Sequence, residues 1–206
     1  MRRMNSAVCF VGVLLAMFAV LAGDACAQGG VYMFQVPATS PWYDTGINLL
    51  GGWQLSITAT GLATYDAFEI GGPLATNANG GDVSGQNFFS DAVLPSAEIH
   101  SLIGKIGGTT SVGSGTPVPG GLAGYGAGFV GESYSEQITT SGRLFLGYND
   151  EVPDFYDNSG GVSVTVTVVP EPSTLGLLGL GVLLLLSGVK GRGNLGKTRD
   201  HSTGPA

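Results

Sequence analysis

The stretch GVSVTVTV, residues 161–168, is the clearest structural signal in the chain. Valine occupies every second position from Val162 to Val168, and serine or threonine occupies the positions between them. This alternation places the valines on one face of a β-strand, toward a core, and the hydroxyl groups on the other, toward water. Residues 161–168 are therefore predicted to form a half-buried strand.

Several shorter segments elsewhere in the chain also have sequences typical of β-strands. Residues 53–60, WQLSITAT, alternate in the same way, and the further predicted strands are residues 31–36, 62–65, 97–106 and 143–148. Turn-forming Gly, Pro, Asn and Asp separate these segments, and residues 107–131 are predicted to form a long, flexible, glycine-rich loop. Because no segment sustains a 3.6-residue period, we predict an all-β fold, an antiparallel β-sandwich or jelly roll.

Composition narrows the possible functions. The chain has 206 residues, of which 11% are charged, whereas about 25% is usual for globular proteins. This length allows one domain with appendages and excludes a large multidomain enzyme. Residues 28–172 carry thirteen acidic side chains against Lys105 and Arg143, a formal charge of −11. Such a domain attracts cations and repels polyanions, so a nucleic-acid partner is not expected.

Residues 1–27 have the pattern of a signal peptide. Two arginines precede an apolar run, and Ala25-Cys26-Ala27 fits the small-x-small site of signal peptidase, so we predict cleavage after Ala27. The alternatives are a lipoprotein lipidated at Cys26, which has Asp24 where such sites require a small residue, and an N-terminal membrane anchor, for which the apolar run is short. Cleavage removes Cys9 and Cys26 and leaves an exported chain without thiols.

Residues 170–206 have the pattern of a second addressing segment. Pro170-Glu171-Pro172 precedes a predicted membrane span at residues 173–189, and a basic tail follows. This order resembles the PEP-CTERM sorting signal of Gram-negative bacteria, which exosortases process. The resemblance implies a transient anchor, cleavage near the tripeptide, and delivery to the cell surface or extracellular matrix. A permanent single-span anchor is the alternative.

The basic tail also contains a P-loop pattern. Residues 191–198, GRGNLGKT, satisfy GxxxxGK[ST]. A P-loop binds phosphate because it leads from a buried strand into a helix whose N-terminal amides point at the anion. Here the pattern follows the predicted membrane span, so no nucleotide is expected.

Residues 148–160, YNDEVPDFYDNSG, concentrate oxygen donors between two predicted strands. Six Asp, Glu and Asn side chains lie within residues 149–158. Calcium binds six to eight oxygens from carboxylates, amides and backbone carbonyls on a turning loop. The EF-hand order is absent. The segment predicts either a calcium site or a turn in which Asp and Asn serve only the local backbone.

The same segment resembles the calcium-dependent galactophilic lectins of the PA-I type and their galactose-binding-like relatives. The likeness rests on Tyr148-Asn149-Asp150, a short loop, and Asp157-Asn158-Ser159-Gly160 before an alternating strand. Weaker likeness covers residues 42–46, 61–65, 71–73, 102–107 and 129–131. The resemblance implies a galactose-binding-like jelly-roll β-sandwich at residues 28–169.

The resemblance also implies a set of metal ligands. Side chains of Asp150, Asp157 and Asn158 and backbone carbonyls of Tyr65 and Asp154 would hold calcium. The lectins have Asn where this chain has Asp157, which adds a negative charge. The His and Gln that contact sugar in the lectins fall at residues 87–90, which contain neither type, so galactose specificity does not follow and the sugar-binding residues stay unknown.

Little in the sequence supports a catalytic site. His100 is the one histidine of residues 28–172, so a zinc site or a histidine-based triad lacks further members. On the predicted strand at residues 97–106, we expect it at the surface or half-buried. Glu98 and Asp91 could be imagined as the carboxylate pair of a glycosidase, but their sequence positions indicate no cleft.

Four aromatic residues allow two interpretations. They could stack on sugar rings, or they could complete the core of a small sandwich. These residues are Trp42, Tyr43, Phe155 and Tyr156.

The sequence therefore predicts an exported protein that is not an enzyme. It would bind calcium and a carbohydrate at the cell surface or in the matrix of a Gram-negative bacterium. The expected partners are signal peptidase, an exosortase-type enzyme, a membrane during transit, and an extracellular glycan or exopolysaccharide. The alternative is a structural matrix protein that binds no ligand.

Overall fold

The computed structural model describes residues 29–67, 72–82, 84–120 and 125–171. The predicted signal peptide with Ala25 and Ala27, the tripeptide's Pro172, the predicted span at 173–189 and the P-loop pattern lie outside these ranges. Within the ranges, no helix has the length and apolar character needed to cross a membrane.

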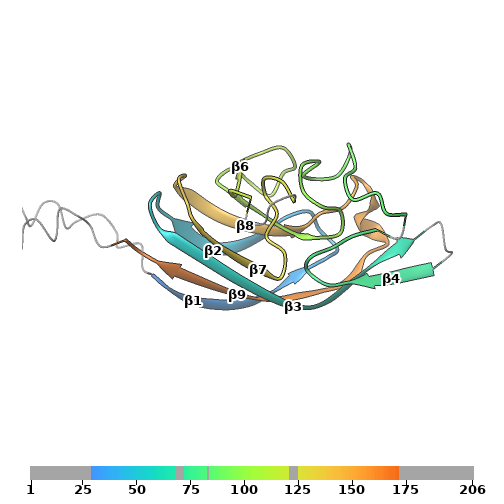
Figure 1. Cartoon of the computed structure of the whole chain (residues 1–206), viewed down its shortest axis with the longest axis horizontal. Helices are drawn as coiled ribbons and strands as arrows, with labels where there is room; N and C mark the ends of the chain where they lie inside the picture. The colour runs from blue at the N-terminus through green and yellow to red at the C-terminus, as the bar shows by residue number, and fades with distance from the viewer. Residues whose placement is uncertain (1–28, 68–71, 83, 121–124, 172–206) are drawn as a thin grey trace, which may run out of the picture. The chain divides into compact units, whose positions relative to one another are not determined.

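The described residues form a sandwich of two antiparallel sheets (Figure 1). Its elements are β1 (Gly30–Pro37), β2 (Tyr43–Leu49), β3 (Gln54–Ala67), β4 (Gly72–Thr76), β5 (Leu102–Ile106), β6 (Thr116–Pro117), β7 (Ser133–Gln137), β8 (Gly142–Tyr148), the 3₁₀ turn η1 (Asp154–Tyr156) and β9 (Ser159–Val169).

One sheet has five strands and the other has four. The five-stranded sheet runs β1-β9-β3-β4, and β7 pairs with the part of β3 that β4 leaves open. The four-stranded sheet runs β2-β8-β5-β6. Every pairing is antiparallel. The valine-rich stretch is β9, and it lies between β1 and β3.

The main core lies between the two sheets. Val162, Val164, Val166 and Val168 are all buried, and Ile57 of β3 lies opposite Val166 with no exposed surface. The serine and threonine positions of β9 are exposed or half-buried. The predicted strand at 161–168 and its inward face are confirmed.

A second apolar cluster lies against the four-stranded sheet, under the long loops. Trp42, Ile103, Phe129 and Phe145 belong to it and are at most 5% exposed. Lys105 is 1% exposed, and its Nζ lies 4.3 Å from the centre of the Trp42 ring. The loops thus cover the outer face of the four-stranded sheet. In a sandwich with two polar outer faces, that face would be exposed to solvent.

Some predicted boundaries were wrong. Residues 54–60 and 62–65 belong to one strand, because Gly61 continues β3 with a φ of 108° that glycine tolerates. Residues 97–101 are not extended as strand, since β5 begins at Leu102 and His100 has a φ of 60°. The predicted loop at 107–131 contains the short strand β6, which pairs with β5.

Besides β6, three further strands were missed. β4 and β7 have five residues each, carry Gly and Pro or Glu, and lack a regular alternation of apolar and polar side chains. β2 does alternate in burial, but Asp44, Gly46 and Asn48 on its outer face are residues typical of turns. Pairing with β8 and β3 keeps them extended, as tertiary context often overrides local preference in strands.

Candidate functional site

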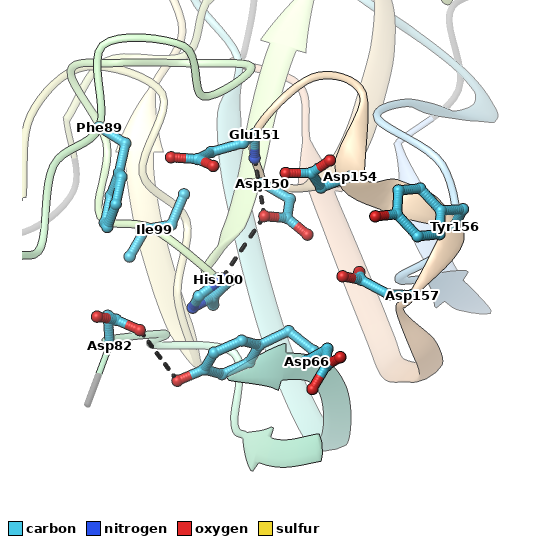
Figure 2. Close-up of a pocket in the computed structure, with 11 residues that line it drawn as sticks. Asp66, Asp82, Phe89, Ile99, His100, Asp150, Glu151, Asp154, Tyr156 and Asp157 are labelled. Carbon is cyan, nitrogen blue, oxygen red and sulfur yellow. Dashed lines mark hydrogen bonds and ion pairs between the residues drawn. The ribbon is translucent and has the colours of Figure 1, made fainter. Parts of the chain in front are cut away.

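A pocket of about 320 Å³ lies at the end of the sandwich where β3 finishes and β9 begins (Figure 2). β3 supplies Tyr65 and Asp66, and the segment between β8 and β9 supplies its most acidic wall. The full lining is Tyr65, Asp66, Asp82, Phe89, Ile99, His100, Asp150, Glu151, Asp154, Tyr156 and Asp157. Four of the five predicted metal-ligating residues therefore line a single pocket.

The lining carries a strong negative charge. Six carboxyl groups face one histidine. Burial, together with the charges of Asp150 and Asp154, raises the pKa of the Asp157 carboxyl. Burial and neighbouring carboxylates, Asp91 first among them, raise the pKa of Glu151. The acidic groups thus repel one another in a partly dehydrated space.

Asn158, the fifth predicted ligand, lies directly behind Asp150. Its Nδ2 donates to Asp150 Oδ2 at 2.6 Å and to the carbonyl of Ala38 at 3.2 Å. Its Oδ1 is buried and has no hydrogen-bond partner. Asp150 also accepts a hydrogen bond from the Glu151 amide at 2.8 Å. An unpartnered amide oxygen beside a buried carboxylate is costly unless a cation or a donor meets it.

The two predicted backbone ligands have different surroundings. The carbonyl of Asp154 accepts a hydrogen bond from the amide of Asp157 at 3.3 Å, within η1. A carbonyl oxygen has a second lone pair that could still reach a cation. Tyr65 belongs to β3 opposite Leu74 of β4. Its side chain also lines the pocket, and its hydroxyl donates to Asp82 Oδ1 at 3.3 Å.

His100 is the main residue that the sequence placed wrongly. It is 6% exposed, rather than at the surface or half-buried. Its ring stacks on Tyr65 at 3.5 Å between centres. Nδ1 lies 3.1 Å from the carbonyl of Gly81, and Nε2 lies 3.6 Å from Asp150 Oδ1. Its φ of 60° is a left-handed backbone conformation, which nothing in the local sequence predicts.

Asp82 is a second residue that the sequence reasoning missed. It comes from the loop after β4, which packs against the pocket through the contact between Gly81 and His100. Although burial opposes it, hydrogen bonds from Ser84, the nearby His100 and the Tyr65 hydroxyl hold the pKa of Asp82 below its ordinary value. Asp82 therefore provides an ionised acceptor on the wall opposite Asp157 (Figure 2).

The predicted metal donors are all oxygen atoms. In the described part of the chain, no three His, Cys, Asp or Glu side chains come together as a metal cluster. The predicted set has only two such side chains, Asp150 and Asp157, and takes its other oxygens from an amide and from carbonyls. Such mixed oxygen ligation is typical of calcium, and the partnerless Oδ1 of Asn158 fits it.

The alternative site residues do not assemble here. Glu98 is 8% exposed and Asp91 is exposed, and neither lines the pocket. The four aromatic residues divide: Trp42 is buried, and Tyr43 and Phe155 pack against core clusters. Tyr156 is 82% exposed and lines the pocket. Phe89, from the segment where the lectins place sugar contacts, also lines it.

Comparison with known proteins decides the identity of the C-terminal segment. Residues 168–192 match the model of the PEP-CTERM protein-sorting motif. The chain carries a PEP-CTERM sorting motif. That motif indicates an exported protein with a transient membrane anchor.

The sandwich has a match among solved structures. The matched structure is described as the EclA N-terminal domain, a PllA-like lectin, with a TM-score of 0.39 and 21% identity over 67% of this chain and 96% of that chain. The sandwich assignment rests on the strand pairings. No curated protein matches the sequence.

Proposed function

We propose that the exported domain binds one calcium ion and, next to it, a carbohydrate in the acidic pocket. The observation that carries the proposal is the buried Asn158 Oδ1, which has no partner although the same amide group holds Asp150 in place. An oxygen left in this state beside several carboxylates has the chemistry of an incomplete cation site.

Each predicted ligand has a defined part in this arrangement. Asp150 and Asp157 supply charge, Asn158 supplies its amide oxygen, and the carbonyls of Tyr65 and Asp154 complete an oxygen set. Burial and the nearby charges of Asp150 and Asp154 raise the pKa of Asp157, and a bound divalent cation offsets the part that comes from charge repulsion. Asn158 acts as a positioning residue too, since its Nδ2 orients the Asp150 carboxylate.

A carbohydrate suits the rest of the pocket. Calcium accepts oxygen ligands from outside the protein, and sugar hydroxyls are such ligands. Asp82 is an ionised acceptor for hydroxyl donors, and Tyr156 and Phe89 offer aromatic surface to a sugar ring. A pocket of about 320 Å³ lies at the small end of ligand sites, so a terminal sugar or disaccharide is the size of ligand we expect.

Calorimetric titration of the exported, processed protein with calcium tests the metal site. Wild type should release or absorb heat with saturation near one ion per chain. Asp157→Ala should weaken binding at least tenfold, whereas Asp82→Ala, which removes a pocket carboxylate outside the predicted set, should leave calcium affinity within threefold. Equal losses in both variants, or no heat with wild type, would contradict the assignment.

The carbohydrate claim needs a separate measurement. On an array of β-galactosides and bacterial exopolysaccharides, binding should appear with calcium and disappear with a chelator. Retained calcium binding with a flat array response would restrict the function to metal binding. No response of either kind would favour the structural matrix protein that binds no ligand.

We further propose that an exosortase-type enzyme cleaves the tail and that the domain reaches the surface or matrix of a Gram-negative bacterium. The sorting motif at residues 168–192 supports this proposal. Intact-mass analysis of the exported protein should show a chain that begins at Gln28 and ends near Pro172. Retention of the residues after Pro172 would instead indicate a permanent anchor.

A further inference from the structure

β1 forms an edge of the five-stranded sheet and differs from the other edges. β1 has one partner among the described residues, β9, and it keeps an unbroken register over all eight of its residues. An open edge presents backbone N–H and C=O groups that can pair with another chain. Figure 1 shows β1 along the outside of the sheet.

The free backbone groups of β1 can be assigned to particular residues. Ala38, directly after β1, donates its N–H to the carbonyl of Gly160 at 3.2 Å. In an antiparallel ladder, alternate residues bond to the same neighbour. The even-numbered residues of β1 therefore face β9, and the N–H and C=O groups of Val31, Met33 and Gln35 point away from it.

The other edges carry features that discourage pairing. β2 has a register shift and carries the ion pair of Asp44 with Arg143. β4 contains Pro73, β6 has two residues including Pro117, and β7 contains Glu136. Such charges, prolines and irregularities protect natural sheet edges from pairing. β1 has no charged residue and no proline before Pro37.

The solvent-facing side chains along this edge are uncharged, and two of the three are apolar. Val31 is 65% exposed and Met33 is 80% exposed. Residues 28–172 carry a formal charge of −11, so two copies of the domain repel each other over most of their surface. An uncharged, mainly apolar edge is where two copies can meet without bringing acidic groups together.

We propose that two copies of this chain pair through their β1 edges, antiparallel about Met33, and join their five-stranded sheets. In this register Met33 lies opposite Met33 of the second copy, and Val31 lies opposite Gln35. Every free N–H of Val31, Met33 and Gln35 then meets a carbonyl of the second copy. The arrangement is self-complementary, as a two-fold interface requires, and the two methionine side chains cover each other.

The pairing has a consequence for binding, which rests on the proposed function. Antiparallel pairing of β1 reverses the direction of every strand between copies, so the two acidic pockets lie at opposite ends of the joined sheet. Each dimer can then hold two glycan chains and link them. Dimerisation itself does not depend on calcium or sugar.

Light scattering after size-exclusion chromatography of the exported, processed protein tests the pairing. Wild type should shift from the monomer mass toward twice that mass as concentration rises, with or without a chelator. Met33→Lys should stay monomeric, because it sets two ammonium groups against each other. Thr58→Lys adds the same charge on the exposed face of β3, away from the edge, and should still dimerise.

A cysteine trap provides a second readout. After loss of the predicted signal peptide the chain has no cysteine, so Met33→Cys should form a disulfide-linked dimer under mild oxidation and Thr58→Cys should not. A wild type that remains monomeric, or Met33→Lys and Thr58→Lys variants that dimerise equally, would overturn the proposal. Because neither readout involves calcium, failure here leaves the calcium titration to decide the proposed function independently.

Discussion

The two ends of β9 differ in chemistry although one strand joins them. At one end, Val168 pairs with Gly30 and Val169 pairs with Gln54, in regular, uncharged strands. At the other, Ser159 follows the acidic segment that lines the pocket. The eleven residues of β9 separate these ends by roughly 35 Å.

Under the proposed function, this difference places the sorting motif and the ligand pocket at opposite ends of β9. The sorting motif begins at Val168, inside the regular end of β9, and the tripeptide near which we propose cleavage follows directly after the strand. The pocket occupies the opposite end, where loops can carry charges that a strand core would not tolerate. β9 therefore connects the end that leads into the sorting motif to the end that carries the proposed binding pocket.

The largest loss of stability is expected from a charge placed in the core between the two ends of β9. Val166 lies near the middle of β9, between Tyr32 of β1 and Ile57 of β3, with no exposed surface. Val166→Asp should lower the free energy of unfolding by on the order of 4 kcal/mol, because an unpaired carboxylate is buried. Urea denaturation measures the change.

The matched control is Thr165→Asp, one residue earlier on the solvent face of the same strand. We expect it to change the free energy of unfolding by about 0.5 kcal/mol or less. If both variants lost the same stability, β9 would not have the two-faced burial described here.

A second test concerns Lys105, a charge buried away from the pocket. Burial lowers its pKa to about 8 from the ordinary 10.5, and its Nζ donates to the carbonyl of Ser111 and to Ser114 Oγ. Between these two pKa values the unfolded chain binds more protons than the folded one, so stability should rise with pH. The cost of burying the cation is fully present below pH 8.

Thermal unfolding between pH 7 and about 9.5 checks this sign. The melting temperature of Lys105→Met, relative to wild type, should be highest at the low end of this range, and the difference should shrink as pH rises. A constant difference would show that Lys105 keeps its proton throughout. Burial raises the pKa of Tyr134 and Tyr148 in the folded chain, so at higher pH their ionisation in the unfolded chain would also change the stability. The measurements therefore stop below the pH at which tyrosine ionises in the unfolded chain.

The smallest expected effect is at Gly61, where β3 passes from the regular half of the sandwich to the pocket half. Its φ of 108° is one that side-chain-bearing residues rarely adopt. Gly61→Ala should cost about 1 kcal/mol of stability, measured by urea denaturation, with Thr60→Ala as the neighbouring control. An equal cost at both positions would mean that Gly61 has no special role.

The regular end of β9 and the pocket end also differ in how well the sequence predicted them. Alternation identified β9 and the first half of β3, because burial of one face leaves a period of two in the side chains. It missed β2, β4 and β7, whose extension depends on their neighbours. The sequence prediction also divided β3 at Gly61, because glycine is common in turns and the alternation pattern does not show that this glycine continues the strand.

The pocket was predictable where its residues are close in sequence. Asp150, Asp154 and Asp157 attract notice because three acids within eight positions on a turn suggest a cation. Tyr65 came from the resemblance alone. His100 and Asp82 lie on loops that are distant in sequence from the acidic segment. The left-handed backbone conformation of His100 is predicted by no local pattern.

The most direct test of the account is the melting temperature of the exported protein with and without calcium. Binding to the folded state should stabilise wild type by about 2.7 kcal/mol when free calcium is a hundred times its dissociation constant. Asp150→Ala and the more exposed Asp157→Ala, each compared with its own calcium-free form, should lose this gain, while Asp82→Ala should keep it. No calcium-dependent rise in wild type, or an equal rise in all three variants, would contradict a calcium site built from Asp150, Asp157 and Asn158.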